Sequence, residues 1–263
     1  MIGSRLRRGL LAAVAASVLA APVSAEQSDD EALARFIAGN TLFTLYHEIG
    51  HALVHLLDLP VLGREEDAVD GFAAMIMIPE TEDEFADDLV IAAADGWALI
   101  YEEEQSGGEG AAYWGEHSLD IQRFYALGCL IYGSDPDGFT DYADDIELPA
   151  ERRERCEEDY ARTLDTWGKL LANHRGPGRR DFQLEFQPAR GDAAREAAAF
   201  LKESEIVQAA VAGIDDLVTL PSSVKVSFAT CGEPSAYYDP APRAVTFCYE
   251  LVDYFGQLGA DAP

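Results

Sequence analysis

The sequence predicts an α+β protein that is mostly α-helical and ends in a small β hairpin or sheet. Between Glu31 and about His174, apolar residues recur at helical spacing, separated by short turns rich in Gly, Pro or acidic residues. After residue 181, short segments alternate apolar and polar side chains, as strands do. With 263 residues, the chain is long enough to bury one sizeable core.

The first 25 residues have the pattern of a signal peptide. Three arginines between residues 5 and 8 precede an apolar run over 10–20, and small residues occupy positions 23 and 25. The run is short for a membrane span. We therefore expect cleavage after Ala25 and a periplasmic or secreted protein, with an uncleaved anchor as the alternative.

The composition is strongly acidic, with 48 Asp and Glu against 19 Lys and Arg and a formal net charge of −29. Such a charge repels nucleic acid and anionic lipid. We expect neither a nucleic-acid partner nor stable membrane insertion once the signal peptide is removed.

The helical part should contain five helices, each ended by a turn or a proline. Pro60 and Gly63 separate the first two, and Ser118 is a candidate N-cap for the fourth. The expected helices cover residues 31–57, 65–78, 87–104, 118–132 and 149–174.

The C-terminal part mixes strands and helix. Strands are expected at 182–186 and 224–228, with an Ala-rich helical region at 191–213 between them. Residues 231–250 are predicted to form a hairpin that turns at 239–242.

Four cysteines, an even number in an exported chain, predict two disulfides. Three pairings are possible. We favour Cys129–Cys156 and Cys231–Cys248, because each pair lies within one local unit.

The residues most informative about function are His47, Glu48 and His51, which form an H-E-x-x-H pattern in the first helix. Residues four apart lie on one face of a helix, so both imidazoles can reach one metal ion. Glu48 lies beside them as a general base, which is the pattern of a zinc hydrolase. A chance match is the alternative, but Thr44 and the uncharged residues within the pattern fit the extended zincin consensus.

A catalytic zinc site needs a third protein ligand. Glu66 and Asp70, one turn apart on the next helix, resemble the E-x-x-x-D pair of gluzincins. That resemblance implies that Glu66 binds zinc and that Asp70 hydrogen-bonds a ligand histidine. Glu65 and Asp67 are rival ligands, though neither has a carboxylate four residues on. A solvated acidic helix start is the alternative interpretation.

Four segments of the chain resemble a bacterial family of exported zinc metallopeptidases. They are YHEIGHAL, LPVLGREEDAVD, EHSLDIQRFYALGCLIYGSDP and CGEPSAYYDPAPRAVTFCYEL. The resemblance implies a gluzincin-like site and proteolysis, and no particular substrate. One departure is Ser235, where the family usually has Asn.

We therefore expect a signal peptide over 1–25 and one zincin-like metallopeptidase domain over 26–263, helical at 26–175 and α/β at 181–263. Its reaction would be hydrolysis of peptide or protein substrates with Zn²⁺. His117 and Tyr125 are candidate donors to the oxyanion. Two alternatives are a non-catalytic zinc-binding or interaction protein on a zincin scaffold, and a binding module in which the motif is accidental.

The late hairpin is a candidate for binding substrate. Ser235, Ala236 and Tyr237 begin a stretch similar to the N-A-Y-Y strand of neprilysin-type enzymes, but here it follows the zinc motif. We expect the hairpin to fold back against the helix of His47 and His51 and to offer substrate a strand edge. A purely structural hairpin is the alternative.

Overall fold

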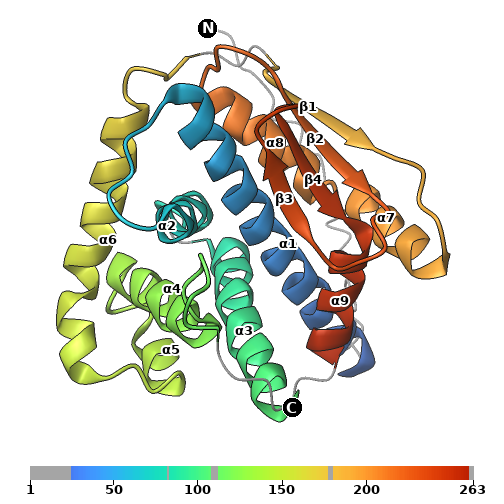
Figure 1. Cartoon of the computed structure of the whole chain (residues 1–263). Coiled ribbons are helices and arrows are strands. Elements are labelled where there is room, and N and C mark those ends of the chain that lie inside the picture. Colours follow the sequence, from blue (N-terminus) through green and yellow to red (C-terminus); the bar gives the residue numbers. More distant parts are fainter. Residues whose placement is uncertain (1–24, 82, 108–111, 177–179, 261–263) are drawn as a thin grey trace, which may run out of the picture.

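The computed structural model describes residues 25–81, 83–107, 112–176 and 180–260. It confirms the predicted class, because helices dominate and a small four-stranded sheet lies in the C-terminal part (Figure 1). Apart from Ala25, the predicted signal peptide falls outside the described residues. Within the described part of the chain, none of the helices combines the length and the apolarity needed to cross a bilayer.

The helices follow the predicted order with small shifts at their ends. The first starts earlier than expected, at Ala25, and two helices were not predicted: α5, within an expected turn region, and α9, after the last strand. The described helices are α1 (Ala25–Leu57), α2 (Glu65–Met77), α3 (Glu84–Gly107), α4 (Asp120–Ser134), α5 (Thr140–Asp145), α6 (Ala150–Leu171), α7 (Asp192–Glu203), α8 (Ile206–Leu217) and α9 (Tyr249–Ala260).

The predicted N-cap of α4 is wrong. The N-cap position is held by Leu119, and Gln122 accepts a hydrogen bond from the Leu119 backbone N–H through its side chain. The Ser118 hydroxyl instead donates to Asp67 on α2, at 2.6 Å. A contact between elements therefore outweighs the local capping preference.

The sheet has the strand order β1-β2-β4-β3, in which β1 is Phe182–Phe186, β2 is Val224–Ala229, β3 is Ala236–Asp239 and β4 is Ala244–Cys248. The β1, β2 and β4 strands are mutually parallel, whereas β3 runs antiparallel to β4 and is the first strand of the predicted hairpin. This topology leaves β3 at an edge of the sheet.

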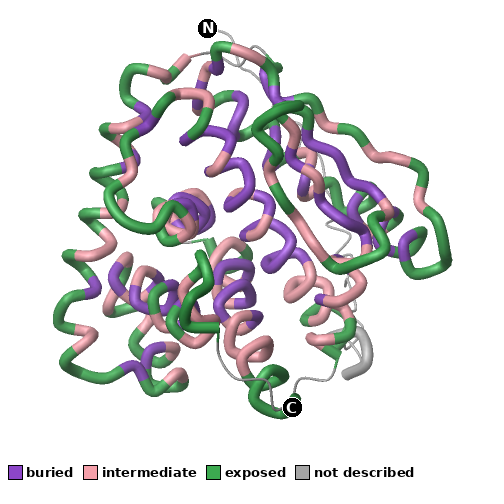
Figure 2. The backbone as a smooth tube through the Cα atoms, in the orientation of Figure 1, coloured by how far each residue is buried: buried purple, intermediate pink, exposed green. Residues whose placement is uncertain are grey.

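Helix α1 passes through the middle of the molecule, between the sheet and the other N-terminal helices (Figure 1). It contacts α2, α3, α8 and α9 as well as β3 and β4. Its middle is buried (Figure 2), with Leu45, Ile49 and Leu53 fully inaccessible at four-residue spacing. Burial on several sides fixes the helix that carries the H-E-x-x-H motif.

Helix α1 ends in a way that turns the chain back beside it. Asp58 adopts a left-handed conformation with φ 51°, and the N–H of Leu59 bonds the carbonyl of Val54 at 3.0 Å. This is a Schellman ending, and Pro60 then prevents further helix. The chain re-enters helix at Glu65, where three acidic residues of the first turn are stabilised by the helix dipole.

Gly50, inside the H-E-x-x-H motif, allows α1 and α2 to approach closely. A Cβ at Gly50 would lie 2.8 Å from the Cβ of Val69, closer than side chains pack. A larger residue at position 50 would push α2 away, and with it the acidic residues of its first turn.

Both predicted disulfides are present. Cys129–Cys156 joins α4 to α6, and Cys231–Cys248 ties the segment before β3 to the end of β4. They close loops of 27 and 17 residues, each worth about 3 to 4 kcal/mol in the chain-entropy estimate.

Candidate metal centre

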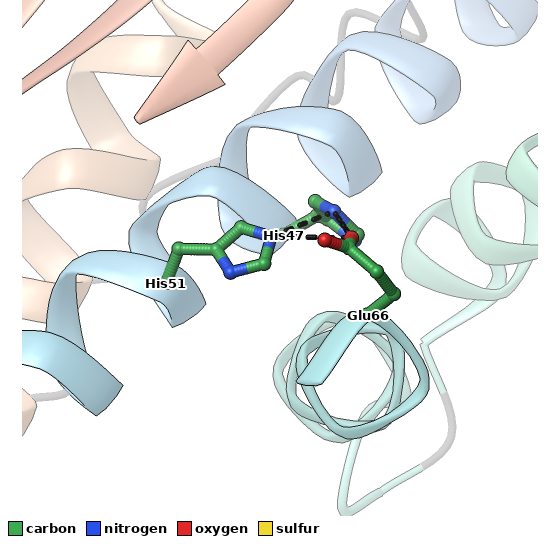
Figure 3. Close-up of side chains that lie close together, drawn as sticks. All are labelled: His47, His51 and Glu66. Carbon is green, nitrogen blue, oxygen red and sulfur yellow. Dashed lines mark hydrogen bonds and ion pairs between the residues drawn. The ribbon is translucent and has the colours of Figure 1, made fainter. Parts of the chain in front are cut away.

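Three side chains from two helices converge on one point between α1 and α2 (Figure 3). Nε2 of His47 lies 3.2 Å from Nε2 of His51. Oε2 of Glu66 lies 3.1 Å from the first nitrogen and 3.3 Å from the second. The two imidazoles come from successive turns of α1, and the carboxylate comes from the first turn of α2.

These distances fit one tetrahedral metal ion. Zinc–nitrogen and zinc–oxygen bonds of about 2.0–2.1 Å place neighbouring ligand atoms of a tetrahedron about 3.3 Å apart. Three donors at 3.1–3.3 Å from one another therefore form one triangular face of such a site. Three protein donors are also the number found in catalytic zinc sites, in which water or substrate takes the fourth position.

The two rival carboxylates lie elsewhere. Glu65 contacts Nδ1 of His51 at 2.8 Å, on the far side of that ring from the convergence point. Asp67 accepts the Ser118 hydroxyl. Of the three consecutive acids, the geometry therefore favours Glu66 as the third donor.

Each imidazole is oriented by a carboxylate at its other nitrogen. Asp70 Oδ1 lies 2.7 Å from Nδ1 of His47, and Glu65 does the same for His51. Such acceptors hold the Nδ1–H tautomer and leave Nε2 free to bind metal. The partner of His47 is the one expected from the sequence; the partner of His51 was missed, although an acidic residue beside Glu66 was visible in the sequence.

A further residue that sequence reasoning missed is Arg123 of α4. It donates two hydrogen bonds to Asp70, from Nε at 2.8 Å and from Nη2 at 2.7 Å. Its guanidinium stacks over the ring of Trp97, 3.5 Å from the centroid. Bidentate pairing and stacking are interactions that lysine cannot reproduce. Arg123 thereby fixes the carboxylate that orients His47.

Burial and charge set the protonation of this centre. Burial raises the pKa of Glu48, although the nearby histidines and a hydrogen bond from the Tyr238 N–H oppose it. Burial would lower the pKa of His47, but hydrogen bonds with Asp70 and Glu66 raise it to about 9. Burial would raise the pKa of Glu66, but hydrogen bonds with His117, His47 and His51 hold that pKa well below the ordinary range.

The convergence point opens into a cavity of about 940 Å³ between α1, the start of α2, the segment before α4, and β3. Glu48 lines it while being only 7 % exposed. Across the cavity Tyr238 is tied to α1, because its hydroxyl lies 2.9 Å from Nδ1 of His55. Strand β3 thus forms one wall of the cavity beside the motif, as the sequence predicted.

The remaining predicted site residues separate into two groups. His117, Ala236 and Tyr237 line the cavity, and Nε2 of His117 lies 2.9 Å from Oε2 of Glu66. Ser235 is not among the lining residues, and its carbonyl accepts a ladder hydrogen bond from the Cys248 N–H.

The prediction for Tyr125 is wrong. Tyr125 packs beside the Cys129–Cys156 disulfide and does not line the cavity. It lies two positions after Arg123 on α4, which places it on roughly the opposite face of the helix.

Two imidazoles and a carboxylate around one point, with a buried glutamate beside them, are an arrangement that metal-dependent hydrolases use. The family comparison agrees: the model of DUF4344, described as "Putative metallopeptidase", matches residues 15–171 and 186–262. The chain belongs to this family. No curated protein and no solved structure matches it.

Proposed function

We propose that the protein is a zinc-dependent peptidase that hydrolyses peptide bonds outside the cytoplasm. The observation that carries the proposal is the triangle of donor atoms from His47, His51 and Glu66, with the buried Glu48 at its side. Two disulfides and the signal-like N-terminus support export.

The residues present divide the chemistry between them. When bound, zinc supplies a Lewis acid that activates water as a nucleophile near neutral pH. The Glu48 carboxylate accepts the proton of the attacking water and passes it to the leaving nitrogen. His117 lies beside Oε2 of Glu66 and is a candidate donor to the oxyanion that forms.

Strand β3 is suited to hold the peptide. The Cys248 N–H donates a hydrogen bond to the Ser235 carbonyl, so Ser235 faces β4. In an antiparallel pair, every second residue directs its N–H and C=O groups away from the partner strand. Ala236 and Tyr238 therefore direct these groups to the free edge of β3. The Tyr238 N–H is already used by Glu48. Ala236 therefore keeps both groups for substrate, which favours a peptide bound antiparallel to β3 and opposite Ala236.

The proposal is tested on purified protein spanning residues 26–263. We expect close to one zinc per chain by elemental analysis, and cleavage of an unfolded test protein that a chelator abolishes and added zinc restores. Zinc without cleavage would indicate a non-catalytic zinc-binding protein instead. Absence of both would leave the motif without a metal role.

The contact between Arg123 and Asp70 gives a prediction on metal affinity. Replacing Arg123 by Met frees the Asp70 carboxylate to rotate, so His47 loses its fixed orientation. Partners of this kind are worth about 10–100-fold in metal affinity. A competition titration with a chromophoric chelator should show that weakening in Arg123→Met, while Arg155→Met, an exposed arginine on α6, binds zinc like the wild type. Equal affinities in both variants would contradict the role of Arg123.

A further inference from the structure

The segment that carries His117 is a short connection, residues 112–118, which we call the His117 loop. It has no regular secondary structure and precedes α4. Gly115, Glu116 and His117 line the cavity, whereas Tyr113 and Trp114 project outward, with Trp114 87 % exposed. The loop therefore forms the cavity wall across from β3, while much of its own surface is exposed and does not pack against the rest of the protein.

The loop is attached to the protein through the start of α2. Arg64 donates from Nη1 to the His117 carbonyl at 3.4 Å and to the Ser118 hydroxyl at 3.1 Å. The same hydroxyl donates to Oδ1 of Asp67 at 2.6 Å. The fourth contact is that of the His117 ring with Glu66.

These contacts join the loop to residues on both sides of the third metal donor. Arg64 is the N-cap residue of α2, and Asp67 follows Glu66 directly. Ser118 serves as acceptor for Arg64 and donor to Asp67, so one hydroxyl couples the two charged groups. A charged acceptor makes the 2.6 Å bond stronger than a neutral one. The contacts with Arg64 and Asp67 thus hold both the backbone carbonyl of His117 and the side chain of the next residue, Ser118.

We propose that Arg64, Asp67 and Ser118 are positioning residues that hold the His117 imidazole beside the open side of the metal centre. The inference rests on the proposed function. It assigns a task to Asp67, the acid of α2 that contacts neither His47 nor His51. His117 itself is half-exposed, with 54 % of its side chain accessible, so packing alone does not fix its ring.

The test compares Asp67→Ala and Ser118→Ala with the wild type in zinc content and steady-state cleavage of a fluorogenic peptide. We expect unchanged zinc content and a kcat lowered about 10-fold at nearly constant KM, because a misplaced donor stabilises the transition state less. The conservative variants Asp67→Asn and Ser118→Thr keep an acceptor and a hydroxyl, and should recover most of the loss. Asp216→Ala, an exposed carboxylate on α8, is the matched control.

A second arm separates positioning from a general structural effect. In a His117→Ala background the two alanine substitutions should cause no further loss of kcat, because the residue they position is absent. An unchanged loss in that background would overturn the proposal.

A third arm does not depend on activity. Hydrogen exchange of the His117 loop in the metal-free protein should be faster in Asp67→Ala and Ser118→Ala than in the wild type or Asp216→Ala. Exchange that stays at the wild-type rate would also overturn the proposal. If the wild type cleaves no peptide, the proposed function fails, and this arm still decides whether Asp67 and Ser118 hold the loop.

Discussion

Replacing Glu48 by Gln is expected to reduce peptide hydrolysis by about 10²–10⁴-fold while zinc stays bound. The amide has the shape of the carboxylate and can still accept the N–H of Tyr238, so the burial of the side chain does not change. It cannot accept a proton from water, and general base catalysis contributes about 10²–10⁴-fold. The donors His47, His51 and Glu66 remain in place.

The measurement combines zinc analysis with kcat/KM for a fluorogenic peptide. Glu154→Gln, an exposed glutamate of α6, is the matched control and should behave like the wild type. If Glu48→Gln lost its zinc, Glu48 would be holding the site together and the division between ligands and base would be wrong. If it kept full activity, another group would be the base.

The parts of the site that the sequence predicts are those set by local geometry. His47 and His51 lie one turn apart on any helix, and the Pro60 break is close enough to bring the next helix back beside them. A carboxylate in that first turn is then within reach. The choice among Glu65, Glu66 and Asp67 depends on the rotation of α2, which Gly50 and Val69 set by close packing. The rotation of α2 about its axis cannot be predicted from sequence spacing alone.

Long-range contacts account for most of what the sequence did not predict. Arg123 reaches Asp70 across 53 positions, and its stacking partner Trp97 comes from a third helix. The parallel pairing of β1, β2 and β4 depends on connections that run outside the strands. The placement of β3 beside α1 was accessible only because its sequence resembles a known substrate-binding strand, whereas α9, which carries no such resemblance, was missed.

The second large effect is expected at Glu66. Replacing Glu66 by Ala removes the one carboxylate among the three donors and leaves His47 and His51. Even residues that orient a ligand are worth about 10–100-fold in metal affinity, so loss of a ligand should weaken zinc binding by more than about 100-fold. Protein purified without added metal should therefore contain little zinc and cleave no peptide.

The neighbouring acids supply graded controls for this experiment, because the structure gives each a different contact. Asp67→Ala should keep full zinc affinity, since the Asp67 carboxylate accepts a hydrogen bond from Ser118 and is not one of the three converging donors. Glu65→Ala should fall between the two, weakened by about 10–100-fold, because His51 loses the carboxylate that orients its ring. Chelator competition on the three variants measures the order. If Glu65→Ala lost zinc more completely than Glu66→Ala, Glu65 would be the third donor and α2 would be rotated relative to α1 in the metal-bound protein.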